Sequence, residues 1–255
     1  DAPALKAMDI GVALGSGSDV AKSAADLVLM DDNFQVISAA IMEGRRILAN
    51  VRKTFVYLMS TSIDEVFVVG GSLIFNIPIP LTALQIIWVN LFTGSLPALA
   101  FAYDEDFDHD RVHKGINKSL FSRAVNMLTF GVGILSSVLL FAMYYILNAS
   151  GIEAGLARSV FFVCFASYIL VVAYSFRSLH KLILEYPIFS NRRLNYSIII
   201  ALVVLVLTMV IPSIRTFFGL SVVPFSWIWF ILGWLVLNVA LVEGAKYLFR
   251  RTVRR

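Results

Sequence analysis

Long apolar runs separated by short polar segments dominate the chain after residue 53. Runs of spanning length cover residues 54–75, 82–102, 124–147, 156–176, 195–214 and 225–248. A helix needs about 20 predominantly apolar residues to cross the hydrocarbon core of a bilayer. The pattern therefore predicts a mainly α-helical fold with six transmembrane helices.

The first 35 residues follow a different pattern, typical of a small α/β piece. Residues 2–8 read as a short helix, 10–15 and 27–30 as buried strands, and 20–25 as a helix capped by Ser18 or Asp19. Strand, glycine-rich turn, helix and strand predict a parallel βαβ unit. This unit is too short to fold alone, and the chain starts in mid-pattern at Asp1 without a Met or signal peptide. We therefore expect the chain to be a fragment whose residues 1–35 end a larger domain.

One helical pattern runs from Asn33 to about Phe75 without a stop signal. Its first part, residues 36–53, is amphipathic and reads as a stalk, whereas its second part is apolar. Residues 76–81 contain two prolines and predict a tight turn. We expect a stalk helix that continues into a transmembrane hairpin over residues 54–102.

Composition agrees with a lipid environment. Hydrophobic residues make up 59% of the chain, charged residues only 15%, and the mean hydropathy is +0.82, whereas soluble domains carry roughly 25% charged residues. The net charge of +4 is dispersed at the edges of apolar runs, which excludes a nucleic-acid footprint. The single cysteine, Cys164, excludes an intramolecular disulfide and a multi-cysteine metal site.

Lysine and arginine are distributed asymmetrically between the loops. They gather before the first span, in loops 103–123 and 177–194 and in the tail 249–255, whereas the alternate loops hold only Arg158 and Arg215. Basic loops stay on the cytoplasmic side. The bias predicts a multi-pass protein with both chain ends cytoplasmic and four further spans over residues 124–248. We expect the membrane to be the plasma membrane.

Asp64 and Glu65 are the only ionisable residues in the middle of a predicted span. Such residues are costly in a bilayer, so they are functional candidates by default. Ser62 lies three residues before Glu65, on the same helix face. Asp64 is rotated by about 100° from Glu65; it could face a cavity, take part in proton exchange or stay protonated.

The second span of the hairpin carries Asn90 and Thr93, followed by the helix-weakening Gly94 and Pro97. Because Pro97 has no N–H, we expect the carbonyl oxygen of Thr93 to be free. Carboxylate, amide, hydroxyl and carbonyl oxygens are ligands for a hard cation. The hairpin thus predicts an oxygen-lined cation site at mid-membrane, whose candidate ligands are Glu65, Asn90, Thr93, Ser62 and Asp64. Ser62, Asn90 and Thr93 are also compatible with plain interhelical hydrogen bonds.

Other polar positions give weaker evidence for a functional site. The acidic run 104–110 and His113 could suggest a metal site, but a solvated cytoplasmic loop is the preferred interpretation. Glu243 lies near the end of the last span, where it can reach water. Asn148 begins a glycosylation sequon close to the membrane, to which we give little weight.

Several ordered motifs resemble those of P-type ATPases of the second class, which includes the calcium pumps and the sodium and potassium pumps. The matching segments are Asp1-Ala-Pro-Ala-Leu-Lys6, Ile10-Gly-Val-Ala-Leu-Gly15, Gly17-Ser-Asp-Val-Ala-Lys22, Ala24-Ala-Asp-Leu-Val-Leu29, Asp31-Asp-Asn-Phe34 and Trp88-Val-Asn-Leu-Phe-Thr93. The resemblance covers essentially the whole chain and is weakest over the last four spans.

The resemblance implies a translocase that is phosphorylated by ATP on an aspartate and needs Mg²⁺. Residues 1–35 would complete a haloacid-dehalogenase-like phosphorylation domain, in which Asp1 matches an aspartate that supports the Mg²⁺ and phosphate site. Glu65, Asn90 and Thr93 match cation ligands of the calcium pumps, and Ser62 stands where those pumps usually have Asn. The stalk would transmit motion to these ligands.

Two differences from the calcium-pump pattern affect which ion we expect to be transported. Gly94 replaces an aspartate of the calcium pumps, and residues 160–174 hold no counterpart of their eighth-helix acidic ligand. We therefore expect one cation site and treat calcium as one candidate beside H⁺, Na⁺, K⁺ and Mg²⁺. The phosphorylated aspartate, the ATP-binding parts and helices one to four would lie upstream, so the fragment alone would be inactive. A non-enzymatic six-helix channel or assembly subunit is the alternative class.

Overall fold

The computed structural model describes residues 1–33, 35–104 and 123–253. The chain divides into two compact units, residues 1–48 and 49–255. Helix α3 (Gln35–Ile74) belongs partly to each of them.

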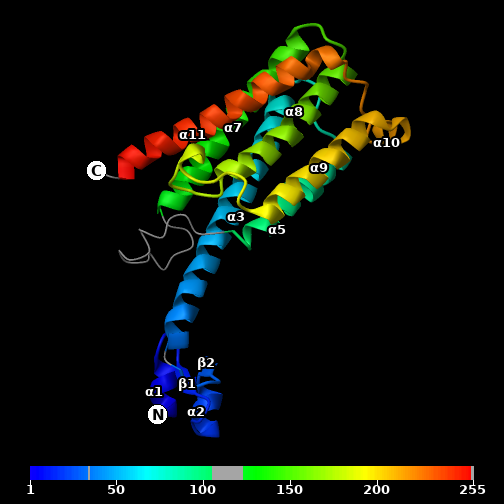
Figure 1. Ribbon diagram of the computed structural model, residues 1–255. Coiled ribbons are helices and arrows are strands. Elements are labelled where there is room, and N and C mark those ends of the chain that lie inside the picture. The colour runs from blue at the N-terminus through cyan, green and yellow to red at the C-terminus, as the bar shows by residue number, and fades with distance from the viewer. Residues whose placement is uncertain (34, 105–122, 254–255) are drawn as a thin grey trace. The chain divides into compact units, whose positions relative to one another are not determined.

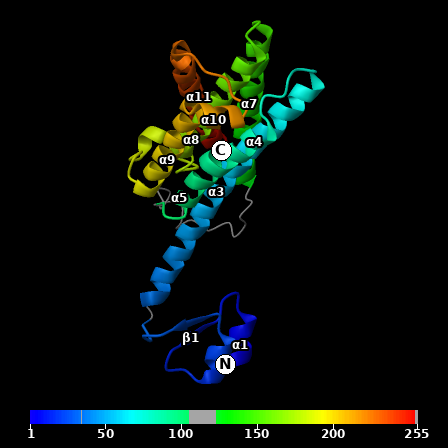
Figure 2. The ribbon, with the colours of Figure 1, turned by 90° about the vertical axis from the view of Figure 1, so that its right-hand side faces the viewer.

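The first unit contains α1 (Ala2–Ala7), β1 (Val12–Leu14), α2 (Asp19–Ala24) and β2 (Leu27–Leu29). The two strands are parallel, with Ala13 opposite Val28, and Figure 2 shows them beside the short helices. The Ser18 hydroxyl accepts a hydrogen bond from the Ala21 N–H at 3.2 Å and caps α2. A Cβ at Gly15 would lie 2.9 Å from two carbonyl oxygens of the β2 end, so only glycine fits this turn. The predicted strand–turn–helix–strand order is confirmed.

Helix α3 is 40 residues long and unbroken, as its pattern predicts. Its end is marked by Asn76, which adopts a left-handed conformation with φ of 52°, and by the Ile77 N–H, which donates to the Ser72 carbonyl at 3.0 Å. The chain then returns through α4 (Ala83–Trp88), a π-helical segment η1 (Val89–Ser95) and α5 (Leu96–Phe101). The predicted hairpin is therefore present.

The rest of the bundle consists of α7 (Arg123–Ala149), α8 (Ala154–Ser175), α9 (Arg192–Val210), α10 (Pro212–Phe217) and α11 (Ile228–Val253), with 3₁₀ turns η2 (Ile183–Glu185) and η3 (Phe225–Trp227). Within the described ranges, six helices are long and apolar enough to cross a membrane, which confirms the predicted number. The fifth span ends earlier than predicted, at Val210, because Pro212 starts α10.

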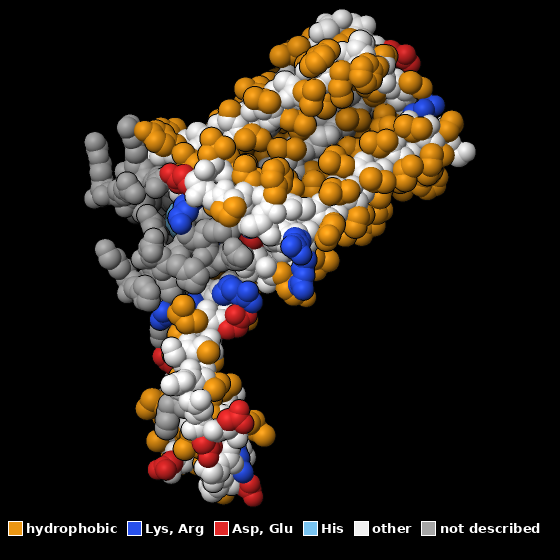
Figure 3. All heavy atoms as spheres, in the orientation of Figure 1, with side chains coloured by type: hydrophobic (Ala, Val, Ile, Leu, Met, Phe, Trp, Pro, Cys, Tyr) orange, Lys and Arg blue, Asp and Glu red, His pale blue; other side chains and the backbone are white. Residues whose placement is uncertain are grey.

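Helix α8 forms the core of the bundle, and its neighbours include α7, α9 and α11 (Figure 1). Buried aromatic rings fill the space around it, such as the stacked pair Phe161 and Phe165, whose centroids lie 5.8 Å apart. Large apolar side chains also cover the face of the bundle that Figure 3 shows. Among the exposed apolar residues, Val66 and Val236 are 75% and 70% exposed. An apolar core inside an apolar exterior is the arrangement expected for lipid as solvent.

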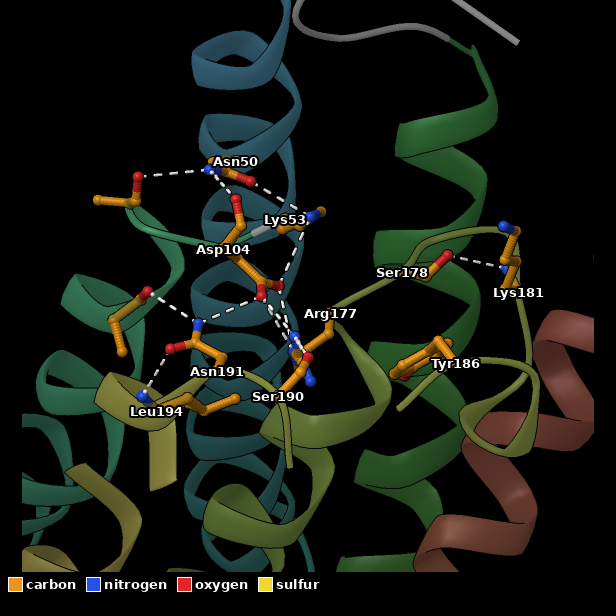
Figure 4. Close-up of polar contacts among 12 residues, drawn as sticks. Asn50, Lys53, Asp104, Arg177, Ser178, Lys181, Tyr186, Ser190, Asn191 and Leu194 are labelled. Atoms are coloured by element: carbon orange, nitrogen blue, oxygen red, sulfur yellow. Dashed lines mark hydrogen bonds and ion pairs between the residues drawn. The ribbon is translucent and has the colours of Figure 1, made fainter. Parts of the chain in front are cut away.

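One end of the bundle is held by a buried ion cluster around Asp104 (Figure 4). The Arg177 guanidinium donates to the Asp104 carboxylate at 2.7 Å, and Lys53 Nζ lies 3.6 Å from it. Asn191, the N-cap of α9, donates to the same carboxylate at 3.2 Å. These residues come from α3 and from the chain next to α5, α8 and α9, so one carboxylate joins four segments of the bundle.

The burial of Asp104 overturns one sequence-based interpretation. Both Asp104 and Arg177 are 0% exposed, so the first residue of the acidic run 104–110 is part of the packed bundle and does not lie in a solvated loop. The run looked solvated because its cationic partners, Lys53 and Arg177, are 51 and 73 residues away in the sequence. The other residues of the run and His113 lie outside the described residues.

Arg177→Ala should destabilise the bundle by about 3–5 kcal/mol, because removal of one partner leaves a buried charge uncompensated. The arginine also donates to the carbonyls of Pro187 and Ile188, so Arg177→Lys should recover only part of the loss. Chemical unfolding of the full-length protein in detergent measures the effect. The exposed Arg192→Ala is the control, and equal stability of the two alanine variants would contradict the role of the cluster.

Candidate cation site

Glu65 and Asn90 meet between the two helices of the hairpin. The Asn90 side-chain amide donates to the Glu65 carboxylate at 3.1 Å, with the other carboxylate oxygen, Oε1, buried and without a hydrogen-bond partner among the described residues. A buried carboxylate oxygen without a donor is unstable unless something positive reaches it. The pair therefore offers an acceptor suited to a cation.

A glycine leaves space next to this pair. A Cβ built on Gly94 would lie 3.8 Å from Asn90 Oδ1, and its other nearest contacts are 3.9 Å away. The amide oxygen of Asn90 thus lies near Gly94, and a Cβ at position 94 makes only ordinary van der Waals contacts there. The position at which the calcium-pump pattern has an aspartate therefore borders Asn90 but carries no carboxylate.

The backbone around Thr93 is π-helical from Val89 to Ser95. The sequence predicted a weakened helix here, and π-helical segments are often found at functional sites. The Thr93 hydroxyl donates to the Val89 carbonyl at 2.7 Å, inside its own helix. Its oxygen lone pairs remain able to accept or to bind a cation.

The prediction of a free Thr93 carbonyl is wrong. The Tyr57 hydroxyl donates to that oxygen at 2.5 Å. Tyr57 is fully buried on α3, with its ring edge-on to Phe101 at a centroid distance of 5.4 Å. Pro97 removes the helical donor, as predicted, but a donor from the neighbouring helix replaces it.

Ser62 lies on α3 close to Glu65 in sequence, yet no hydrogen bond joins the two side chains in the part of the chain that the structure describes. The hydroxyl of the neighbouring Thr61 donates within its own helix, to the carbonyls of Tyr57 and Leu58. Neither hydroxyl is thus engaged by the carboxylate, which stays available to a ligand.

Asp64 does not join this pair. It is 0% exposed and faces α7 and α8, where its carboxylate accepts hydrogen bonds from Ser136 at 2.6 Å, Ser137 at 2.8 Å and Tyr168 at 3.2 Å. We call these four residues the Asp64 cluster. Adjacent residues of one helix thus supply two separate polar sites.

Sequence reasoning missed the three hydroxyl partners of Asp64 and the role of Tyr57. A signal existed for the serines, since Ser136-Ser137 is a polar pair in the middle of an apolar span. Nothing in the sequence indicated which helix the pair faces. Asp1, the residue expected to support Mg²⁺ and phosphate, is exposed at the start of α1 in the first unit, and its side chain does not cap that helix.

Comparison with known proteins identifies relatives across most of the chain. Residues 78–248 match the family described as cation transporting ATPase, C-terminus. Calcium-transporting ATPase 1 of Bacillus cereus is 35% identical over 237 residues, which cover 86% of this chain and 27% of that protein. The calcium-transporting ATPase of Bacillus subtilis is 31% identical over 252 residues, covering 96% of this chain and 28% of that protein.

A further relative, the P-type sodium-transporting ATPase4 of Toxoplasma gondii, is 46% identical over 111 residues, or 43% of this chain and 8% of that protein. The chain spans about a quarter of the length of the two Bacillus relatives. With its six helices of spanning length, the chain is an integral multi-pass membrane segment.

Tyr57→Phe should weaken the hairpin, because it leaves the buried Thr93 carbonyl without a donor. Such a loss costs about 1–3 kcal/mol. Thermal unfolding of the full-length protein in detergent should show a lower midpoint than for Tyr145→Phe, which removes a hydroxyl from a half-exposed side chain. Equal midpoints for the two variants would show that the Tyr57 hydroxyl does not stabilise the π-helical segment.

Proposed function

This chain belongs to the cation-transporting ATPase family, and from that premise we propose that it is the transport part of an ATP-driven cation pump. The observation that carries this proposal is the unpartnered Oε1 of Glu65, buried next to Asn90 inside the membrane-spanning hairpin. The transported cation binds there, with Thr93 and Ser62 as further oxygen ligands. Family membership favours this function over a non-enzymatic channel.

The energy comes from chemistry carried out by the remainder of the protein. ATP phosphorylates an aspartate in a Mg²⁺-dependent step, and residues 1–35 complete the haloacid-dehalogenase-like domain in which this occurs. Asp1 supports the Mg²⁺ and phosphate site there. Because α3 runs without interruption from Gln35 to Ile74, it is a mechanical link between that domain and Glu65. The distribution of basic loops supports an orientation with both chain ends cytoplasmic, and we propose the plasma membrane as the location.

Sequence similarity favours calcium as the transported ion, since both Bacillus relatives are named calcium-transporting. The site itself is less acidic than calcium sites usually are, because Gly94 and the carboxylate-free sequence of α8 leave Glu65 as its single carboxylate. We propose one cation per cycle at this site. The sodium-transporting relative makes Na⁺ the second candidate, with H⁺, K⁺ and Mg²⁺ as the other ions to be compared.

Glu65→Gln should abolish cation-stimulated phosphorylation by ATP or lower the apparent cation affinity at least about tenfold, equivalent to about 1.4 kcal/mol. The change keeps the shape of the side chain and removes the charge that binds the cation. Phosphorylation of the full-length protein is measured against a panel of Ca²⁺, Na⁺, K⁺, Mg²⁺ and H⁺. Glu153→Gln, at an exposed position before α8, is the control; unchanged phosphorylation in Glu65→Gln would refute the ligand assignment.

Gly94→Asp should raise the apparent affinity for divalent relative to monovalent cations, because it places a second carboxylate beside Asn90. Gly94→Ala adds only a Cβ, which meets no atom closer than 3.8 Å, and serves as the steric control. Cation transported per ATP hydrolysed is measured in proteoliposomes. If the aspartate and alanine variants behave alike in ion preference and stoichiometry, position 94 does not border the cation site.

A further inference from the structure

The Asp64 cluster poses a problem that the proposed function leaves unsolved. Asp64 is 0% exposed in the interior of the helix bundle, and no lysine, arginine or histidine forms an ion pair with it among the described residues. The contrast with Asp104, which has both Arg177 and Lys53, is plain. A buried carboxylate without a positive partner has a high desolvation free energy. We therefore ask which positive charge balances Asp64.

The hydrogens of the two serines can be directed in two ways. Ser136 Oγ lies 2.6 Å from Asp64 Oδ1 and 2.9 Å from the Val132 carbonyl, and Ser137 Oγ lies 2.8 Å from the same Oδ1 and 2.6 Å from the Gly133 carbonyl. A hydroxyl has one hydrogen and two acceptor lone pairs. When the hydrogens go to the backbone carbonyls, the lone pairs of both hydroxyls face the carboxylate, an arrangement that repels unless a cation lies among these oxygens.

We propose that the Asp64 cluster is a second cation site, separate from the Glu65–Asn90 pair, and that it binds a monovalent cation of the size of Na⁺. Its ligands are the Asp64 carboxylate, the two serine hydroxyls and the Tyr168 hydroxyl. The serines donate to Asp64 when no ion is bound, and turn their hydrogens to the backbone when an ion enters. This inference rests on the proposed function only in placing the cluster inside a cation transporter.

Charge selects the valence of the ion. One carboxylate and three neutral hydroxyls give a neutral site with a monovalent cation, whereas a divalent cation would leave an uncompensated positive charge in a medium of low dielectric constant. The ligand atoms are hard oxygens, which suit alkali and alkaline-earth ions and not soft metals. The hydroxyl oxygens lie at hydrogen-bond distances of 2.6–3.2 Å from the Asp64 carboxylate, so an ion enters only when these oxygens move apart. The smaller Na⁺ needs less of this movement than K⁺ and is therefore favoured.

The neighbourhood of the cluster is consistent with a separate site. Other ionisable groups near it are Glu65, the next residue on α3, and Tyr57, which donates to Thr93 on the hairpin side. Glu65 is bonded to Asn90, and α7 contributes Ser136 and Ser137. The two carboxylates therefore use different helices for their partners, so that each site can be altered without direct loss of a ligand from the other.

The test measures Na⁺ binding directly. The full-length protein is purified in detergent, with choline replacing Na⁺ to keep the ionic strength constant, and both the melting temperature and the amount of bound ²²Na⁺ are recorded. We expect Na⁺ to raise the melting temperature of the unaltered protein, K⁺ to do so less, and the effect to persist in Glu65→Gln. Asp64→Asn should abolish the Na⁺ effect, and the double variant Ser136→Ala, Ser137→Ala should weaken the apparent Na⁺ affinity at least tenfold.

Ser167→Ala is the matched control, because Ser167 is a buried serine on α8 whose hydroxyl donates to the carbonyl of Val163 in its own helix; it should keep the Na⁺ effect. If Asp64→Asn does not fold, the double serine variant decides. The proposal is overturned if Na⁺ has no effect on the unaltered protein, or if Glu65→Gln loses the effect while Asp64→Asn retains it. Failure of the pump assignment is seen separately, as absence of cation-stimulated phosphorylation, and leaves the Na⁺ result readable.

Discussion

A membrane-spanning bundle must satisfy its buried polar groups from within, because lipid offers no hydrogen bonds. This constraint accounts for the polar features of the structure. Three carboxylates of the bundle, of which Asp64 and Asp104 are buried and Glu65 is half-buried, each have a different solution. Asp104 has cationic side chains from neighbouring segments, Asp64 has three hydroxyl donors, and Glu65 has one amide donor and an oxygen left over.

These three solutions correspond to three tasks. A carboxylate that is fully paired and hydrogen-bonded, as Asp104 is, holds helices together and leaves nothing for a ligand. A carboxylate with an unpartnered oxygen, as Glu65 has, gains most from an incoming cation. Asp64 lies between these extremes, because its serine partners can also bond to their own helix backbone.

The hairpin shows how a helix can be interrupted without an exposed break. Pro97 removes a backbone donor, the chain widens into a π-helical segment from Val89 to Ser95, and Tyr57 supplies a hydrogen bond to the Thr93 carbonyl from α3. The interruption thereby ties the two helices of the hairpin together at the level of Thr93. The Tyr57 hydroxyl thus links α3 to the same backbone that carries Asn90 and Thr93, a connection through which the proposed pump would couple the two helices.

The sequence by itself determined the six spans, the α/β start of the chain, the tight turn after α3 and the prominence of Glu65 and Asn90. These features rest on local periodicity and on the cost of polar residues in lipid. Only the tertiary structure decided that Asp104 is buried, that Asp64 faces Ser136, Ser137 and Tyr168, and that Tyr57 fills the gap left by Pro97. Helical periodicity gives the direction of a side chain around its own axis but not which helix packs there, so partners 36 to 104 residues away could not be foreseen.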